Sequence, residues 1–180
     1  MRKLVLVTFI VFGCLHLNAQ THTDTLLSTP KKDLSTFIKV INAAGLNIFN
    51  GQPVTIFAPD NEAFDKFSSS KIDSLLMPSN KSLLISTLDF HIIAGKLTAK
   101  DIAKAIHDGG GHATFRTLAG TKLNAKINAN RNIVLFDGSG CESVIRVFNI
   151  NQGNADMFVI DSVLLPKNKY LQFTSTNNKN

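Results

Sequence analysis

Residues 55–67 read TIFAPDNEAFDKF, and in this stretch a strand-like run leads into a helix-like run through a single proline. The residues before the proline are β-branched or aromatic, as half-buried strands prefer. Pro59 ends the strand because it has no N–H to donate to a neighbouring strand, and Asp60 can cap the helix that follows. Phe64 and Phe67 are three positions apart and therefore lie on one face of that helix. The stretch predicts a strand, a fixed corner and a short helix whose aromatic face packs on the core.

Apolar residues recur at helical spacing on both sides of this corner. Gly45 follows one such run at the position of a helix C-cap, and Asn80 or Ser79 precedes another at the position of an N-cap. Thr98 and Asp101 have the spacing of a capping box, which predicts the start of a further helix. The expected helical segments are 33–44, 72–76, 83–88 and 98–108.

From residue 114 onward the pattern changes to short extended runs separated by turn-rich segments. Leu123, Ala125 and Ile127 alternate with polar neighbours, so this run is expected to bury one face. Because helices come first and strands follow, without an alternation of the two, the sequence predicts one α+β domain with an antiparallel sheet. The expected strands are 114–118, 123–127, 133–136, 143–150 and 157–164.

The first residues have the form of a secretory signal peptide. A cationic start precedes an apolar run over 4–15 and then Asn18-Ala19-Gln20, where a small residue suits cleavage. We expect residues 1–19 to be removed and the mature chain to be secreted, periplasmic or held at the cell surface. Cleavage before Cys14, with lipidation of that cysteine, is the alternative, because residues 11–14 loosely resemble a bacterial lipobox.

The net charge of +6 gives little reason to expect a nucleic-acid partner. Most of the excess lies in the predicted signal peptide and in residues 167–180, which we expect to form a disordered basic tail. In residues 20–166, the numbers of acidic and basic residues are nearly equal. The sequence there shows no clustered basic face of the kind that nucleic-acid binding needs. Beyond the signal peptide no apolar stretch has the length of a membrane span, so we expect no transmembrane segment in the mature chain.

Four segments together resemble the fasciclin domain family, in the family's order. Residues 55–64, TIFAPDNEAF, are similar to its first signature, and residues 158–166, FVIDSVLLP, to its closing signature. Residues 90–96, FHIIAGK, stand where the family carries a Tyr-His pair followed by Pro-Gly-Lys, and residues 118–123, LAGTKL, resemble its strand-turn-strand. The likeness covers residues 24–166, so we expect one fasciclin-like domain over that range.

This resemblance implies a fasciclin-like α+β fold in which N-terminal helices pack on an antiparallel β-wedge. It also implies an exported module for cell adhesion or matrix interaction, which binds an extracellular protein or glycan and has no catalytic site, metal or cofactor. We expect a monomer. The family's Tyr-His region has been implicated in receptor binding, and the matching residues, Phe90 and His91, are therefore candidate binding residues.

Two features of this sequence favour a different role for the Phe90–His91 pair. Phe90 lacks the hydroxyl group of the family's tyrosine. His91 continues the apolar stripe of Leu84 and Leu88, at a position that faces the core if the helix reaches it. A buried imidazole needs hydrogen-bond partners, so we expect a structural histidine bonded to the chain.

Three clusters of polar residues give weaker grounds for chemistry. His107, Asp108 and His112 could in principle ligate zinc, but their spacing is not that of a closed site and three glycines lie between them. Cys141 beside Glu142 is expected to be a poor nucleophile, because a neighbouring carboxylate raises the pKa of a thiol. A third group has the oxygens of a calcium site without the alternating order of a calcium loop: Asp60, Asn61, Glu62 and Asp65.

A second functional class stays open beside adhesion, a protein that binds or processes a small ligand or polysaccharide through a site that the sequence does not reveal. A fold does not fix a function, so the surface must separate the two classes. A deep polar pocket with converging titratable groups favours this second class, and a flat surface built from loops favours adhesion.

We expect the exported protein to begin at Gln20. The intact mass of the protein recovered from the exported fraction measures this directly. A mass that corresponds to a chain starting at Cys14 with a diacylglyceryl adduct would contradict cleavage after Ala19 and show that the lipobox alternative is right.

Overall fold

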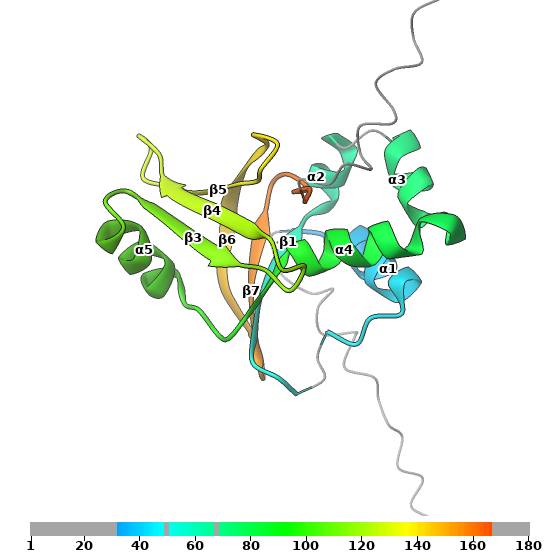
Figure 1. Cartoon of the computed structure of the whole chain (residues 1–180), viewed down its shortest axis with the longest axis horizontal. Helices are drawn as coiled ribbons and strands as arrows, with labels where there is room; N and C mark the ends of the chain where they lie inside the picture. The colour runs from blue at the N-terminus through cyan, green and yellow to red at the C-terminus, as the bar shows by residue number, and fades with distance from the viewer. Residues whose placement is uncertain (1–31, 49–50, 67–68, 167–180) are drawn as a thin grey trace, which may run out of the picture.

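The computed structural model of the chain describes residues 32–48, 51–66 and 69–166. The helices α1 to α4 gather at one end of the molecule, and α5 lies at the other end beside the strands (Figure 1). The helices are α1 (Ser35–Ala44), α2 (Asn61–Lys66), α3 (Ser69–Leu76), α4 (Lys81–Phe90) and α5 (Ala99–Asp108), with a 3₁₀ turn at Pro78–Asn80. The strands are β1 (Val54–Pro59), β2 (Ile92–Ala94), β3 (His112–Arg116), β4 (Lys122–Ile127), β5 (Ile133–Phe136), β6 (Glu142–Gln152) and β7 (Ala155–Ile160).

Within the described residues the strands form one seven-stranded sheet in the order β2-β1-β7-β6-β5-β4-β3. The opening stretch supplies β1, which lies beside the closing strand β7, with Ile56 opposite Met157 and Phe57 opposite Phe158. This pair is parallel, whereas the other pairs of neighbouring strands are antiparallel. The sheet therefore departs from the predicted antiparallel pattern at one place, because the long connection between β1 and β7 returns the chain to the end where β1 begins.

The two outer strands of the sheet approach each other at one end, so the sheet is nearly closed. Ile93 of β2 forms an isolated bridge with Thr117, just after β3. The Leu118 N–H donates a hydrogen bond to the Ile92 carbonyl at 2.8 Å. These contacts hold the turn between β3 and β4 against β2 and the end of α4.

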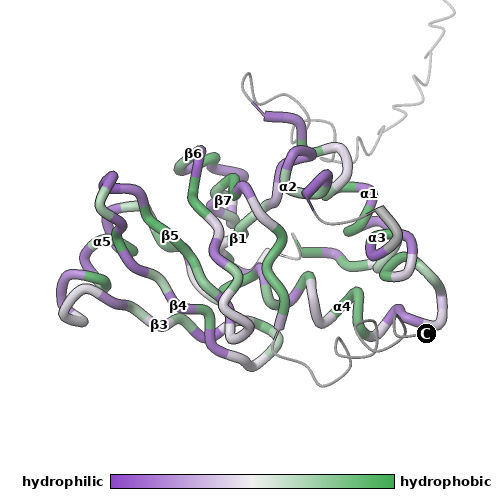
Figure 2. The backbone as a smooth tube through the Cα atoms, turned by 90° about the horizontal axis from the view of Figure 1, so that it is seen from above, coloured by the Kyte–Doolittle hydropathy of each residue, from purple (hydrophilic) through white to green (hydrophobic). Residues whose placement is uncertain are grey.

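Both faces of β1 and β7 are buried, because the sheet carries a hydrophobic core on each side. Ile56 and Met157 belong to the core that α1, α3 and α4 cover. Phe57 and Phe158 belong to the other core, under α5 and strands β3 to β5, and their rings stack with centroids 5.6 Å apart. Figure 2 shows β1 and β7 between these two halves of the molecule. Alternate residues of the same two strands therefore hold the halves together.

The helix ends follow the predicted signals at three places. Gly45 ends α1 in the left-handed conformation with φ at 68°. Thr98 and Asp101 form the capping box at the start of α5. The Asp60 carboxylate accepts a hydrogen bond from the Ala63 N–H at 2.7 Å, which caps α2. These three predictions are confirmed.

Two local features differ from the sequence-based expectation. The Asn80 side chain makes no capping bond to α4, because it donates instead to the Ser74 carbonyl at 2.6 Å and closes the preceding turn. The sequence does not predict the short strand β2, because its three residues directly follow a helix and carry no alternating pattern. It is a strand because it pairs with β1, with Ile92 opposite Ile56.

Several predictions concern residues outside the described ranges. These are the signal peptide at 1–19, the lipidation alternative at Cys14, the basic tail at 167–180 and the aromatic contact of Phe67. In the part of the chain that the structure describes, no helix combines the length and the apolar character needed to cross a bilayer.

Candidate functional site

The junction between α4 and β2 holds the two residues that the family resemblance singles out. Phe90 ends α4 and His91 follows it, and their exposed fractions are only 1% and 2%. The two rings meet edge to face, with centroids 6.4 Å apart. The binding role implied for this pair stays a prediction, while the hydrogen bonds of His91 point to a role inside the fold.

Both ring nitrogens of His91 are hydrogen-bonded to the backbone. Nε2 accepts from the Leu164 N–H at 3.1 Å. Because Nε2 accepts, the proton of the neutral ring lies on Nδ1, which donates to the Thr87 carbonyl at 2.8 Å. The imidazole therefore joins α4 to the segment after β7, which is 73 residues away in sequence.

Burial also determines the charge of His91. It lowers the pKa of the imidazole to about 4, although the Thr87 carbonyl and the negative charge of Asp137 act in the opposite direction. Asp137 holds the residue after Leu164, since its Oδ2 accepts from the Leu165 N–H at 3.0 Å. The segment after β7, which we call the closing segment, is thus held through two successive backbone N–H groups. His91 accepts from that of Leu164, and Asp137 accepts from that of Leu165.

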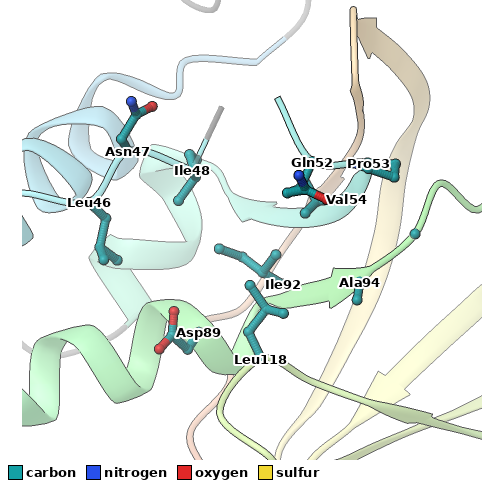
Figure 3. A pocket seen from close by; sticks show the side chains of 11 residues that line it. Leu46, Asn47, Ile48, Gln52, Pro53, Val54, Asp89, Ile92, Ala94 and Leu118 are labelled. Atoms are coloured by element: carbon teal, nitrogen blue, oxygen red, sulfur yellow. The ribbon is translucent and has the colours of Figure 1, made fainter. Parts of the chain in front are cut away.

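A cavity of about 530 Å³ opens beside this junction (Figure 3). Its lining comes from the described parts of the connection between α1 and β1, the adjoining ends of β1 and β2, the last turn of α4 and the turn after β3. Most of the lining side chains are apolar, among them Leu46, Ile48, Pro53, Val54, Ile92 and Leu118. The cavity is therefore an apolar recess where segments distant in sequence meet.

Asp89 is the one ionisable residue that lines this cavity in the described part of the chain. Its side chain projects from the last turn of α4 into the recess (Figure 3). The side chain is half-buried, and burial raises the pKa of its carboxyl group. No other described residue donates a hydrogen bond to this carboxylate or forms an ion pair with it. The site thus combines apolar walls with one unpaired acid.

Comparison with known proteins accounts for this architecture. The sequence profile of the fasciclin domain matches residues 32–166. The chain belongs to the fasciclin domain family. The predicted membership and the predicted fasciclin-like α+β fold are confirmed.

Similar proteins come from bacteria and an insect. Protein sll1483 of Synechocystis sp. is 29% identical over 155 residues, which cover 82% of this chain and 78% of that protein. Cell surface glycolipoprotein MPB83 and immunogenic protein MPB70, both of Mycobacterium bovis, are 32% and 31% identical over 121 residues and 67% of this chain. The aligned region spans about half of those two proteins, 47% and 54% respectively. A solved FAS1 domain pair from the insect cell adhesion molecule Fasciclin I has a TM-score of 0.58 at 27% identity, covering 73% of this chain and 44% of that one. None of these names describes an enzyme.

The histidine cluster of this fasciclin domain does not converge on a metal site. The His107 side chain is 90% exposed at the end of α5, beside Asp108. His112 begins β3, where its ring meets Phe136 edge to face. Among the described residues, no three His, Cys, Asp or Glu side chains gather in a way that could hold a metal ion.

The remaining polar candidates are occupied within the fold. Cys141 is half-buried, and burial raises the pKa of its thiol, as do the charges of Asp137, Asp161 and Glu142. The expected contribution of Glu142 is therefore present but is not the largest. Asp60 caps α2 through one oxygen and forms an ion pair with Lys32 through the other, at 3.1 Å. The apparent calcium cluster is thus built around a buried helix cap.

Sequence reasoning missed Asp89. The available signal was an acidic residue set between Leu88 and Phe90, inside an otherwise apolar run. That signal does not identify a cavity, because the opposite wall comes from the α1–β1 connection and the turn after β3. Only the closure of the sheet brings these segments together.

We expect the fasciclin domain to lose stability as the pH falls from 6.5 toward 4, partly through His91. Its folded pKa of about 4 lies below the ordinary value of 6.5, so the unfolded state takes up the proton first and becomes favoured. The stability that neutral His91 contributes is fully present above pH 6.5, and about 3 kcal/mol of it is lost by pH 4. Urea unfolding measured between pH 6.5 and pH 4 gives the slope of the free energy of unfolding against pH.

The His91→Gln variant should be less stable near neutral pH, by about 1–3 kcal/mol for the lost hydrogen bonds, and should show a shallower dependence on pH. His107→Gln is the matched control, because that side chain is 90% exposed, and it should keep the wild-type slope. An unchanged acid slope in His91→Gln would show that another group causes the destabilisation.

Proposed function

We propose that this fasciclin domain is an exported module that works at the cell surface or in the extracellular space and binds a protein or glycan partner. The similar Mycobacterium bovis protein is named a cell surface glycolipoprotein, and the similar solved structure comes from a cell adhesion molecule. The cationic and apolar start of the chain is in keeping with export, either as a soluble protein or with a lipid on Cys14.

The composition of the cavity is the observation that favours binding over catalysis. General acid–base and nucleophilic mechanisms rely on a reacting group that a second group activates or assists. In the described part of the chain, Asp89 lines the recess without a second carboxylate, histidine, cysteine or lysine. The recess can hold a ligand, but it offers no pair of groups to process one. We therefore assign no enzymatic activity to the domain.

In this proposal Phe90 and His91 stabilise the fold and do not contact the partner. Their burial and the two backbone hydrogen bonds of His91 support a structural role, in which the pair fixes the closing segment against α4. The partner, in this proposal, contacts side chains other than these two. Variants at His91 should then change stability and leave the affinity for the partner unchanged.

The test is a binding screen of the purified protein against panels of extracellular matrix proteins and polysaccharides. We expect saturable binding to at least one member, and loss of that binding when the protein is unfolded by heat. His91→Ala should melt at a lower temperature, because it leaves a cavity and an unpaired backbone N–H. Well below that temperature it should bind its partner with nearly the wild-type affinity.

Three outcomes would contradict this proposal. Absence of saturable binding across the panels would argue against an adhesion module. Hydrolysis or modification of a polysaccharide in the panel would argue for the enzymatic alternative. A His91→Ala variant that melts like the wild type and yet loses binding would show that His91 is a contact residue.

A further inference from the structure

The cavity beside α4 has the size of a small-molecule site. Its volume of about 530 Å³ lies within the range of ligand pockets in proteins, roughly 300–1,000 Å³. Two amide side chains, Asn47 and Gln52, join the apolar residues of the wall. Leu118, on the turn after β3, is 48% exposed, so an apolar wall of the cavity is accessible from solvent.

The Asp89 carboxylate differs from the other acids that this domain buries. Burying a charge is unfavourable unless a partner compensates for the lost water. The other buried or half-buried carboxylates of the described chain each accept hydrogen bonds within the protein: Asp60, Asp137, Asp156 and Asp161. Asp89 has no such donor among the described residues. Among the buried and half-buried acids of the described chain, Asp89 is thus the one without a hydrogen-bond donor, and it lines an apolar cavity.

The lysine that follows β2 in the chain does not supply that counter-charge. Lys96, two residues beyond β2, forms an ion pair with Asp156 at 3.4 Å and donates to the Gly153 carbonyl at 2.9 Å. Its ammonium group is held at the turn between β6 and β7. Lys96 is therefore engaged elsewhere, and a bound molecule can supply a cation for Asp89.

We propose that this cavity binds an organic cation, an ammonium group carried on an apolar body, with the Asp89 carboxylate as its counter-ion. The ammonium donates hydrogen bonds to the carboxylate, and the apolar body packs against Val54, Ile92 and Leu118. Two sources can supply this chemistry, a free amine or the lysine side chain of a partner protein. The site does not rest on the adhesion role, since a free amine can occupy it without any partner protein.

The test compares two probes of the same shape, phenethylamine and phenethyl alcohol, by NMR titration of the purified protein. Shifts of the backbone amides of Ile92, Gly95 and Leu118 report on the cavity. We expect the amine to bind about tenfold more tightly than the alcohol, as a charge-assisted hydrogen bond at a half-exposed site allows. A second titration compares two short capped peptides. One has a lysine between two leucines, and the other has methionine in place of that lysine.

Asp89→Asn keeps the shape of the side chain and removes its charge, so the preference for the amine should fall to near one. Asp73→Asn is the matched control, because Asp73 is exposed on α3 and its charge lies outside the cavity lining. Leu118→Ala should weaken the amine and the alcohol alike by shortening the apolar wall. Unchanged melting temperatures in the three variants exclude unfolding as the cause.

Tight binding of the free amine identifies a small-molecule site, and preferential binding of the lysine peptide identifies the side chain of a partner protein. Either result supports the proposal if Asp89→Asn removes the preference. Equal binding of amine and alcohol to the wild type, a preference that survives in Asp89→Asn, or shifts that fall outside the cavity would each overturn it. None of these failures bears on the binding screen for an extracellular partner, which uses different ligands.

Discussion

The parallel pairing of β1 with β7 is the constraint on which the rest of the domain depends. It places residues 54–59 beside residues 155–160, and all six residues of each strand are buried. The chain between β1 and β7 leaves from one side of this pair and returns on the other side. Closing so long a segment costs conformational entropy, which is offset only when both hydrophobic cores have formed. The closing segment after β7 is then fixed a second time, by His91 through the Leu164 N–H and by Asp137 through the Leu165 N–H.

This arrangement also explains where a binding site can lie. His91 follows α4 directly and is hydrogen-bonded to the backbone through both ring nitrogens. The residue just before the Phe90–His91 pair is Asp89, which projects into the cavity. The Ala119 N–H donates to the Asp89 carbonyl at 3.2 Å, so the turn after β3 is held to the same point. A carboxylate on a backbone fixed from two sides is preorganised, and a ligand that reaches it does not have to order a loop first. Structural and binding functions thus fall on adjacent residues of one helix end.

Three helix ends were readable from the sequence because each depends on near neighbours, whereas the expected cap of Asn80 on α4 does not form. The capping box of Thr98 and Asp101, the left-handed Gly45 and the cap of Asp60 on α2 each follow from residues within four positions of one another. A sheet was also predicted, but the parallel direction of its β1–β7 pair was not, because direction is set by the path of the intervening chain. The strand β2 and the cavity around Asp89 were missed because each depends on residues distant in sequence. β2 pairs with β1, and the closure of the sheet brings the turn after β3 to the cavity.

Hydrogen exchange of the backbone amides tests the central place of the β1–β7 pair most directly. If this pair is the last to open, the amides of Ile56, Phe57 and Phe158 exchange only through global unfolding. Their exchange free energies should then equal the free energy of unfolding measured with urea, and those of the β4–β5 hairpin should be lower. Slower exchange in β4 and β5 than in β1 and β7 would contradict this account, because it would place the stable centre of the domain in the hairpin.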